Sequence, residues 1–406
     1  MHLVDVVIIG AGPAGSAAAT RLAERGRSVV VIDKATFPRD KICGDGLTTS
    51  ALRRLEELDF DPSTVPSWTP VSQVVVRPPY GDEVCYPLPD LDRGLFAVVA
   101  QRRELDAALL RHAEKAGALV HQGSALSDVI INADGTATVT AEGVGELHAR
   151  HVIAADGMWS PTRKLLGENV EGYRGEWHAF RQYVRNVTGR GATDLVVFFE
   201  EDFLPGYFWS FPLGDGRANI GFGIERGGKH SIQDMKDLWP DILSRPHVRE
   251  LLGPDVEPEE PHRAWPIPCR VGRVSLSSGP VLFAGDAAAV CDVMTGEGIG
   301  QALQTGIMAA DAINAHWDDP SAAARAYEAE VLTELGPDDR MSVLLTRAIR
   351  HRKGASIALW ITNRSDWTRR NFVRWLFEDS PRGLPFQPRK WRRGVLSGTG
   401  GYAPKR

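Results

Sequence analysis

The chain has 406 residues, of which 43% are apolar and 24% charged, with 47 Lys and Arg against 52 Asp and Glu. These values are typical of an ordinary globular protein with two or three domains. No apolar run reaches about 18 residues, and the first apolar run begins within a few residues of Met1, so we expect neither a membrane-spanning segment nor a signal peptide. The four cysteines are widely spaced without a CxxC pair, which favours free thiols and predicts no metal site. We therefore expect a cytoplasmic protein.

Near the start of the chain, two short apolar runs stand on either side of a segment with helical periodicity. LVDVVIIG (3–10) and SVVVIDK (28–34) flank SAAATRLAERG (16–26), and this order predicts a parallel β-α-β unit. Two later apolar runs, in ARHVIAADG (149–157) and GPVLFAGDAAA (279–289), also stop at an Asp beside a Gly. We expect them to be strands of the same sheet, with their carboxyl ends facing a ligand.

The turn between the first run and the helix carries the glycine pattern of a dinucleotide site. Gly10, Gly12 and Gly15 are spaced to give a tight turn, close approach of the backbone to a pyrophosphate, and close packing of helix on strand. Asp33 ends the next run, where its carboxylate can accept from a ribose hydroxyl, and Lys34 follows it. The pattern predicts dinucleotide binding; the alternative is a purely structural glycine turn.

The middle of the chain has a different character. Residues from about 62 to 100 and from about 172 to 266 are rich in Pro, Trp and Tyr with alternating apolar positions, which predicts antiparallel strands. The segments after Gly296 follow a helical period. We therefore predict an α/β protein with a Rossmann-like nucleotide-binding domain, an inserted α+β antiparallel-sheet substrate domain and a helical C-terminal region with a basic tail. The predicted ranges are 1–61, 101–171 and 267–319 for the first, 62–100 and 172–266 for the second, and 320–406 for the third.

Three further motifs indicate which dinucleotide is bound. They are Gln101-Arg-Arg-Glu-Leu-Asp106, Ala155-Asp-Gly-Met-Trp-Ser160 and Ala284-Gly-Asp-Ala-Ala288. Together with the glycine turn, they make the chain resemble the geranylgeranyl reductase family of flavoproteins, within the superfamily of FAD-dependent aromatic hydroxylases and halogenases. The resemblance spans roughly residues 4 to 310. It implies FAD as the cofactor and a domain of the glutathione reductase or hydroxylase type.

The resemblance also implies roles for individual residues. Arg102 is expected near the FAD phosphates or ribose, Asp156 and Gly157 near the pyrophosphate, and Asp286 after Gly285 on a ribityl or ribose hydroxyl. Carboxylates suit hydroxyl recognition and a guanidinium suits a diphosphate. Two of these residues have a plainer alternative: Arg102 as a helix-surface cation, and Asp156 as an ordinary turn residue.

The segment after the GDAA motif is expected to face the flavin. Gly296, Gly298 and Ile299 open a helix whose N-terminus would stabilise negative charge on a reduced flavin. The family usually has a proline a few residues after GDAA, where this chain has Val293. That departure puts the detailed shape of this loop in doubt.

An aromatic segment marks the reaction side. Tyr207-Phe-Trp-Ser-Phe-Pro212 resembles the Y-x-W-x-F-P stretch of prenyl reductases. Alternate residues of a strand share a face, so Tyr207, Trp209 and Phe211 are expected to form one wall against an apolar or aromatic substrate, with Tyr207 and Trp209 as catalytic candidates. The alternative is a strand that packs its aromatic rings into a domain core.

Cys43 is the candidate for an acid or a thiolate. Arg39, Lys41, Cys43, Gly44 and Gly46 match the prenyl reductase pattern R-x-K-x-C-G-x-G, which implies that Cys43 and Gly44 lie beside the flavin. The glycines would let the backbone approach the ring system. The neighbouring cations are expected to favour the thiolate, which suits a nucleophile better than a proton donor. The alternative is a small cysteine that only packs near the flavin.

The resemblance implies an FAD-dependent oxidoreductase that reduces carbon–carbon double bonds of an isoprenoid by hydride transfer from reduced flavin N5. The main alternative is an FAD- and NAD(P)H-dependent monooxygenase, or a dehydrogenase, acting on a specialised metabolite. A flavin-bearing binding protein is a third alternative. Halogenation is disfavoured, because residues 70–82 lack the lysine that halogenases carry on an early loop. No second GxGxxG follows, so the reductant is either NADPH bound transiently or a separate electron donor.

The C-terminal region has a charge of its own. From Arg340 onward there are 16 Lys and Arg against 3 Asp and Glu, which leaves 31 against 49 for the first 339 residues. Leu, Ile, Trp and Phe alternate with these basic residues at helical intervals, which predicts contact with a membrane surface and peripheral membrane association. The alternative is a basic helix docked on the acidic body. No nucleic-acid recognition motif accompanies the charge, so no nucleic-acid partner is expected.

Overall fold

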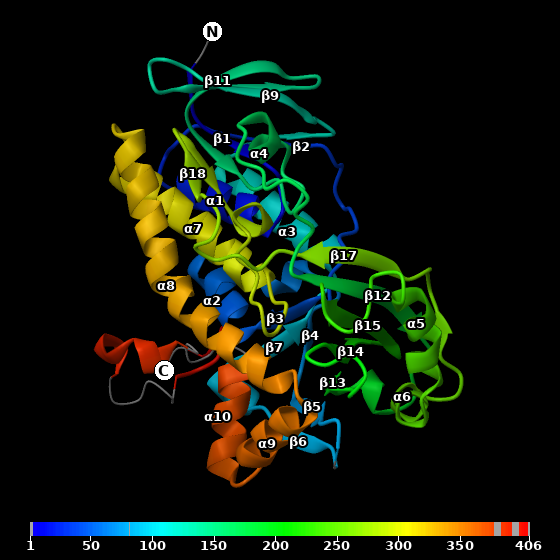
Figure 1. Cartoon of the computed structure of the whole chain (residues 1–406). Helices are drawn as coiled ribbons and strands as arrows, with labels where there is room; N and C mark the ends of the chain where they lie inside the picture. The colour runs from blue at the N-terminus through cyan, green and yellow to red at the C-terminus, as the bar shows by residue number, and fades with distance from the viewer. Residues whose placement is uncertain (1–2, 81, 377–382, 392–397, 405–406) are drawn as a thin grey trace.

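A computed structural model describes residues 3–80, 82–376, 383–391 and 398–404 (Figure 1). Its central feature is a mainly parallel sheet, and four of its strands overlap the apolar runs that were predicted to form it. The strand order is β18 (Ser277–Ser278), β19 (Val281–Phe283), β11 (Gly145–Ala154), β1 (Leu3–Ile9), β2 (Val29–Asp33) and β8 (Leu119–Gln122). All neighbours run parallel except β18 and β19. At the top of Figure 1, β11 continues into an antiparallel ribbon with β10 (Ala137–Ala141) and β9 (Leu126–Ile131).

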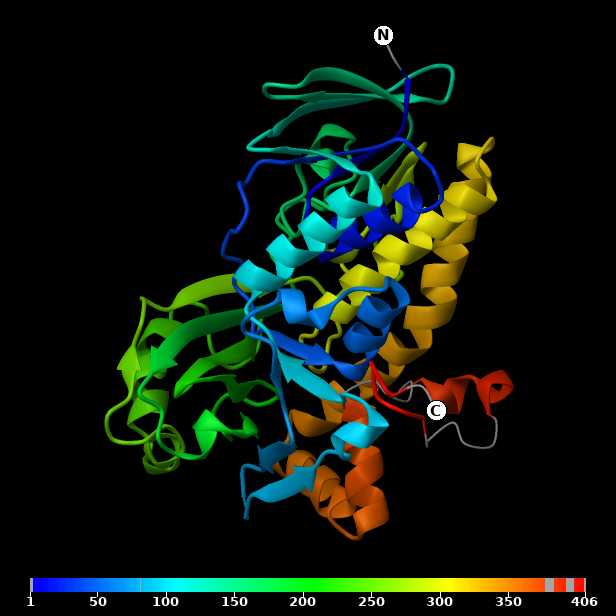
Figure 2. The ribbon, with the colours of Figure 1, turned by 180° about the vertical axis from the view of Figure 1, so that it is seen from behind.

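Three helices pack side by side along this sheet, as Figure 2 shows from behind: α3 (Arg102–Ala116), α1 (Pro13–Ala23) and α7 (Ile299–Ala315). The helix α1 is rich in alanine, and its small side chains are buried. Its contact with α7 is close enough that a Cβ at Gly306 would overlap the carbonyl oxygen of Ala14. The short helices α2 (Thr49–Glu57) and α4 (Pro161–Leu165) complete this half.

A second sheet forms the other half of the molecule. Its order is β16 (Glu257–Pro258), β12 (Trp177–Arg185), β15 (Arg217–Glu225), β14 (Tyr207–Gly214), β13 (Leu195–Phe198), β5 (Gln73–Arg77) and β6 (Val84–Pro87), with β17 (Arg263–Ile267) also on β12. All pairs are antiparallel except β5 with β13. Helices α5 (Met235–Ser244) and α6 (Pro246–Leu252) cover one face with a core of aromatic and aliphatic side chains. The other face is left for the cavity described below.

A small third sheet joins the two halves. It contains β3 (Gly46–Thr48), β7 (Ala97–Val99) and β4 (Thr69–Pro70), with β7 in the middle. The strands of the parallel sheet lie within the three ranges predicted for the nucleotide-binding domain, and those of the second sheet lie within the substrate ranges, apart from the last residue of β17. The small sheet takes strands from both. The fold class is confirmed, and the exact domain boundaries stay a prediction.

The C-terminal region is helical. It contains α8 (Pro320–Ile349), which packs along α7, and then α9 (Arg352–Thr362) and α10 (Asp366–Leu376), which lie beside β5 and β6 in Figure 1. Of the helices in the described ranges, none combines the length and apolar character needed to cross a membrane. Much of the basic tail lies outside the described residues. Its described end returns to the body, where Gly401 pairs with Leu95.

The close contact between α1 and α7 leaves no room for a side chain at Gly306. Replacing Gly306 by Ala should lower the urea midpoint of unfolding and cost about 1 to 3 kcal/mol, because the new methyl group would meet backbone that cannot move aside. As a control, Gly223→Ala on β15 should leave the midpoint unchanged or raise it, since a Cβ there comes no closer than 3.8 Å to its nearest neighbour, the carbonyl oxygen of His178. Equal midpoints in the two variants would contradict this packing.

Candidate active site

A cavity of about 790 Å³ lies where the two large sheets and the loop between β2 and β3 meet. It extends from the glycine turn before α1 to the face of β14 and β13 that is opposite α5 and α6. Of the residues predicted from sequence, Gly15 alone lies outside its lining. The others all line it: Gly10, Gly12, Asp33, Lys34, Cys43, Gly44, Arg102, Asp156, Gly157, Tyr207, Trp209, Gly285, Asp286, Gly296, Gly298 and Ile299.

The three glycines of the turn meet different constraints. Gly10 has φ of +103°, and a Cβ there would overlap the carbonyl oxygen of Ala155. A Cβ at Gly15 would overlap the carbonyl oxygen of Gly10, so Gly15 serves the packing of helix on strand. At Gly12, by contrast, a Cβ would meet only the mobile Nη2 of Arg39, at 3.6 Å. The protein therefore does not itself require a glycine at position 12, and a ligand held at the N-terminus of α1 would.

Asp33 is fixed by the backbone at the end of β2. Its Oδ2 accepts from the N–H of Ala11 at 2.7 Å, and its Oδ1 accepts from the N–H of Ala35 at 2.8 Å. Each carboxylate oxygen keeps a further lone pair, so the side chain can also accept from a hydroxyl group in the cavity. Lys34 beside it is exposed on the cavity rim.

Asp156 offers a second acceptor. Its Oδ2 accepts from the N–H of Thr162 at 2.9 Å, at the start of α4, so it does carry a turn contact. Its Oδ1 is buried without a hydrogen-bond partner among the described residues. Burial raises the pKa of this carboxyl group. A buried acceptor without a donor is costly, and a ligand hydroxyl or N–H would satisfy it.

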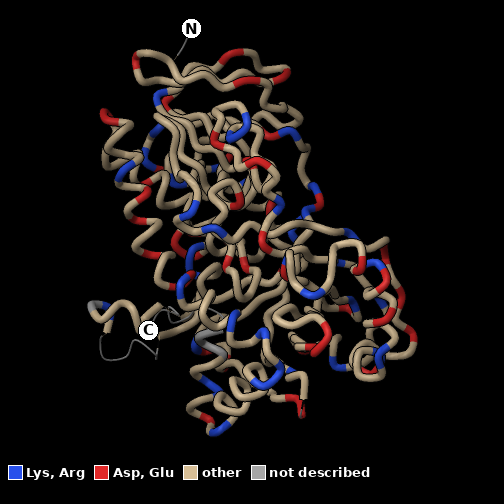
Figure 3. The backbone as a smooth tube through the Cα atoms, viewed as in Figure 1, with Lys and Arg blue, Asp and Glu red and all other residues tan. Residues whose placement is uncertain are grey.

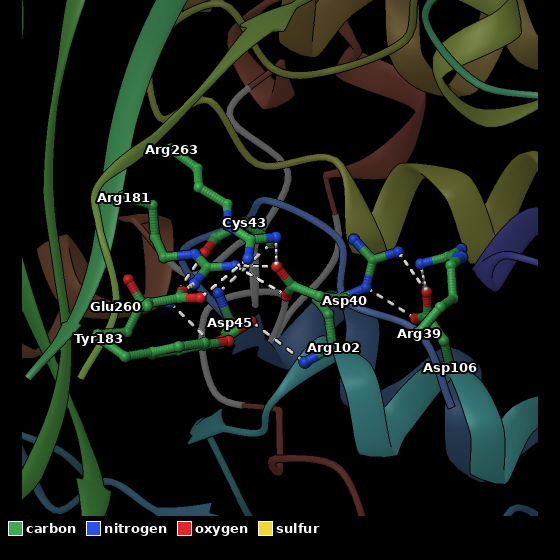
Figure 4. Close-up of polar contacts among 11 residues, drawn as sticks. Arg39, Asp40, Cys43, Asp45, Arg102, Asp106, Arg181, Tyr183, Glu260 and Arg263 are labelled. Atoms are coloured by element: carbon green, nitrogen blue, oxygen red, sulfur yellow. Dashed lines mark hydrogen bonds and ion pairs between the residues drawn. The ribbon is translucent and has the colours of Figure 1, made fainter. Parts of the chain in front are cut away.

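Arg102 is buried at the start of α3, so the alternative of a surface cation is wrong. Its guanidinium donates to both carboxylate oxygens of Asp106, at 2.7 and 2.8 Å (Figure 4). Burial alone would lower the pKa of Arg102, but the attraction of Asp106 outweighs it and the pKa is raised. Arg39 also contacts Asp106, with Nη1 at 3.0 Å from Oδ2, and its second terminal nitrogen, Nη2, lies beside Gly12. Arg39 thus places a cation beside the glycine turn, a position that the sequence reasoning did not assign.

The GDAA motif and the loop after it also line the cavity. The thiol of Cys291 donates to Asp286 Oδ1 at 3.4 Å, while Lys41 Nζ lies 4.0 Å from Asp286 Oδ2. The helix α7 begins at Ile299 with Gly298 as its N-cap. Val293, which stands at the place of the family proline, is buried in a cluster with Trp177, Cys269 and Cys291.

The predicted aromatic wall lies on the cavity face of β14. Tyr207, Trp209 and Phe211 all line the cavity, with neighbouring ring centroids 6.2 and 6.3 Å apart. Phe208, between them, points to the opposite face and joins the core under α5 and α6. The hydroxyl of Tyr207 donates to the carbonyl oxygen of Thr295, and burial raises its pKa. This phenol is therefore held in place as a neutral group.

The loop around Cys43 packs against this wall. A Cβ at Gly44 or at Gly46 would come within 3.2 Å of the ring of Phe211, so these glycines allow the loop to approach the aromatic face of β14. Asn219 Nδ2 donates to the carbonyl oxygen of Cys43 at 2.8 Å and fixes the loop from β15. The sequence predicted close approach to a ligand; in the structure the close neighbour is Phe211.

The pKa of Cys43 shifts opposite to the sequence expectation. Burial raises it, and the nearby Arg102 guanidinium lowers it by less than burial raises it. The backbone N–H of Asp45 donates to the sulfur at 3.4 Å. The shift favours the neutral thiol, which is opposite to the thiolate that the neighbouring cations led the sequence analysis to expect. The difference arises because the cations are visible in the sequence and the burial is not.

Asp45 is the centre of a buried polar cluster that no sequence motif indicated. Its Oδ2 accepts from Tyr183 OH at 2.7 Å and from Asn219 Nδ2 at 2.8 Å, and its Oδ1 accepts from the N–H of Arg102 at 3.2 Å. Burial raises the pKa of Asp45 to about 6, although these donors favour the charged form. Arg181 lies beside the cluster and pairs with Asp40 and Glu260, and Arg263 also contacts Asp40 (Figure 4).

Lys41 is another residue that the sequence reasoning quoted without assigning it to the site. Its Nζ lies 3.5 Å above the ring centroid of Trp265, and both side chains line the cavity. Burial lowers the pKa of Lys41 to about 8, against the opposing effect of Asp286. The residue belongs to the same R-x-K-x-C-G-x-G motif as Cys43, so the motif itself was the signal.

Comparison with known proteins agrees with this geometry. A family model described as an FAD binding domain matches residues 3–330. The menaquinone reductase of Mycolicibacterium smegmatis is 34% identical over 329 residues, which cover 76% of this chain and 75% of the relative. Digeranylgeranylglycerophospholipid reductase 2 of Methanopyrus kandleri is 33% identical over 325 residues, 76% of each chain. This chain belongs to the geranylgeranyl reductase family of FAD-binding flavoproteins. It is an FAD-dependent oxidoreductase.

Solved structures agree on the fold. A geranylgeranyl bacteriochlorophyll reductase-like protein from Thermoplasma acidophilum superposes with a TM-score of 0.78 at 21% identity, over 96% of this chain and 99% of that one. The halogenase PltM superposes with a TM-score of 0.71 at 17% identity, over 95% and 84%. At these identities the likeness shows the shared fold alone.

The residues present fit FAD. Gly12, the N-cap of α1, leaves open space at the N-terminus of that helix, and Arg39 places a cation beside it. The Oδ1 atom of Asp156 has no hydrogen-bond donor among the described residues and can accept one from a ligand. Asp33 and Asp286 supply carboxylates at two further places along the cavity. A diphosphate flanked by hydroxyl-bearing chains matches this order of cation, helix N-terminus and carboxylates. The individual cofactor contacts stay a prediction.

A substitution at Gly12 should weaken FAD binding without lowering the stability of the apoprotein. Gly12→Ala should weaken FAD binding about tenfold or more, because its methyl group would occupy the space that a diphosphate needs. The unfolding midpoint of the apoprotein should change little, since only Arg39 Nη2 lies nearby. Flavin fluorescence titration and thermal unfolding measure the two effects. As a contrast, Gly15→Ala should lower the midpoint of the apoprotein; unchanged FAD affinity in Gly12→Ala would contradict the assignment.

Asp45 predicts a pH dependence of stability. Its raised pKa means that the folded protein holds this proton more tightly than the unfolded chain, so the stabilisation is present at low pH and lost as pH rises through about 6. Asp45→Asn does not titrate. The free energy of unfolding of the variant minus that of wild type should therefore increase between pH 4 and pH 7, by about 2 to 3 kcal/mol. Urea unfolding at both pH values measures it, and a constant difference would show that Asp45 does not carry this proton.

Proposed function

We propose that the protein reduces carbon–carbon double bonds of an isoprenoid chain, either a geranylgeranyl-type lipid or the prenyl tail of a lipid. The single observation that carries this proposal is the cavity itself, whose lining contains both an apolar aromatic wall on β14 and the half-buried cysteine Cys43. The names of the relatives support the same substrate class, since one is a menaquinone reductase and the other acts on a digeranylgeranylglycerophospholipid.

Reduction of an alkene adds one hydride and one proton across the double bond. The chemistry that bound FAD supplies is hydride transfer to one of the two carbons. An isolated alkene accepts hydride poorly, so proton donation to the other carbon has to accompany the transfer. Cys43 is proposed as that donor, because its raised pKa keeps the proton on Sγ at neutral pH. The thiolate left behind regains its proton from solvent after product leaves.

The aromatic wall is proposed to orient the chain. Trp209 Nε1 donates to Asn219 Oδ1 at 3.1 Å, and Tyr207 is held by Thr295, so both rings present fixed apolar surfaces. Such surfaces bind an isoprenoid through its methyl groups and exclude water from the double bond. The phenol of Tyr207 does not compete with Cys43 as the acid, since its proton is already engaged.

The reductant and the site of action are part of the same proposal. NADPH, or a separate electron donor, delivers the two electrons that each turnover consumes. Because the substrate is a lipid, the basic C-terminal region is proposed to contact a membrane surface, and the protein to act as a peripheral membrane enzyme.

Anaerobic incubation with prenylated lipids under reducing conditions tests the reaction. Mass spectrometry should show a product heavier by two hydrogens. A product heavier by one oxygen atom, formed in air with NAD(P)H, would establish the alternative of a hydroxylase and exclude the reductase.

The role of Cys43 has its own test. Cys43→Ala should lower kcat about 100-fold or more while the flavin spectrum of the protein is retained, because the general acid is lost and the cofactor site is not. Cys43→Ser, a much weaker acid of similar size, should be similarly slow. Cys85→Ala is the control, since Cys85 is exposed on β6 outside the cavity lining. Full activity of Cys43→Ala would remove the thiol from the mechanism.

A further inference from the structure

The helix α9 is apolar on two opposite faces. Its inner face carries the buried residues Ala355 and Leu359, and Leu359 packs into the cluster formed by β5 and β6. Its outer face carries Ile357, Trp360 and Ile361, whose side chains are 55%, 61% and 52% exposed. These three positions follow the i, i+3, i+4 spacing of a single helical stripe. The inner stripe accounts for the docking of α9 on the sheet, and the side chains of the outer stripe are more than half exposed.

The next helix also exposes a large apolar side chain. Trp367, in the first turn of α10, is 61% exposed. Between the two helices, the guanidinium of Arg364 lies 4.6 Å above the ring of Trp360. We call Ile357, Trp360, Ile361 and Trp367 the outer face of the α9–α10 hairpin. Two tryptophans and two isoleucines that are more than half exposed within one helical hairpin are unusual on the surface of a monomer and mark an interaction site.

The segment that forms the hairpin is rich in basic residues, which Figure 3 marks in blue along the backbone. Residues 352–376 contain six Lys and Arg and a single acidic residue, Asp366. Arg352 pairs with Glu201 and Arg369 pairs with Asp366. Lys353 and Arg370 form no ion pair with any residue that the structure describes. Because the first 339 residues carry more acidic than basic side chains, an anionic surface would attract the hairpin and repel the rest of the body.

The inner side of the same hairpin reaches the cavity. Phe372 of α10 lines it together with Val76, Val197 and Phe199, which belong to the apolar end of the cavity. The ring of Phe372 contacts that of Tyr86, at a centroid distance of 5.0 Å. One short helix pair therefore separates the apolar end of the cavity from an exposed apolar surface.

We infer that the α9–α10 hairpin docks the protein on an anionic membrane and that the lipid substrate enters the cavity past Phe372. Tryptophan and isoleucine in a basic setting suit the interface between headgroups and acyl chains. A second copy of this chain is disfavoured as the occupant, because a symmetric contact would bring the basic residues of both copies together. The docking stands on the surface alone, while the entry route rests on the proposed function.

Vesicle binding tests the docking. Wild-type protein should co-sediment with vesicles of phosphatidylglycerol and phosphatidylcholine, weakly with phosphatidylcholine alone, and less well at high salt. Trp360→Ser/Ile361→Ser should bind the anionic vesicles about tenfold more weakly or worse. Leu119→Ser/Ile130→Ser is the matched control, since these side chains are 57% and 53% exposed at the opposite end of the molecule; its binding should equal that of wild type.

Two results would overturn the docking. One is absence of vesicle binding by wild type, and the other is equal binding by the two double variants. Loss of a concentration-dependent dimer in Trp360→Ser/Ile361→Ser, without vesicle binding by wild type, would assign the outer face to a second copy of the chain.

The entry route is tested by how the substrate is presented. With a prenyl lipid embedded in anionic vesicles, Trp360→Ser/Ile361→Ser should turn over about fivefold more slowly or worse than wild type, and with the same lipid in detergent it should equal wild type. Equal rates in both presentations would overturn the route. If no prenyl lipid is reduced in either, the proposed function fails, and the vesicle result still decides the docking.

Discussion

The buried carboxylate of Asp45 is the interaction on which the arrangement of the site depends. It accepts hydrogen bonds from three parts of the chain that are far apart in sequence: the start of α3, β12 and β15. These contacts fix the loop between β2 and β3 against both halves of the molecule, and Cys43 is two residues away on that loop. The position of the thiol therefore follows from a polar cluster that takes no direct part in the proposed reaction.

Burial changes the acid–base character of this loop more than the neighbouring charges do. The pKa of Lys41 is lowered to about 8, that of Asp45 is raised to about 6, and that of Cys43 is raised. In each case the shift favours the neutral form, as expected for groups removed from water. These shifts bring the pKa values of Lys41 and Asp45 closer to neutral pH than those of the same groups in water.

The parts of the site that were predictable are those set by local chain geometry. The spacing of Gly10, Gly12 and Gly15 requires a particular turn, and the alternation of Tyr207 and Trp209 follows from the geometry of a strand. The parts that were not predictable depend on residues far apart in sequence. The parallel pairing of β5 with β13 and the partners of Asp45 are of this kind. The pair between Arg102 and Asp106 is an instructive exception, since it joins neighbours at i and i+4 on a helix and was open to sequence reasoning.

The three-stranded sheet between the two halves has a mechanical consequence. β3 begins at Gly46, directly after the Cys43 loop, and its register with β7 pairs Gly46 with Val99, Leu47 with Val98 and Thr48 with Ala97. Separating the halves like a hinge would break this ladder and pull the Cys43 loop away from its anchors. A hinge opening of the two halves would therefore cost the backbone hydrogen bonds between β3 and β7, whereas a movement confined to side chains at the edge of the cavity would leave them intact.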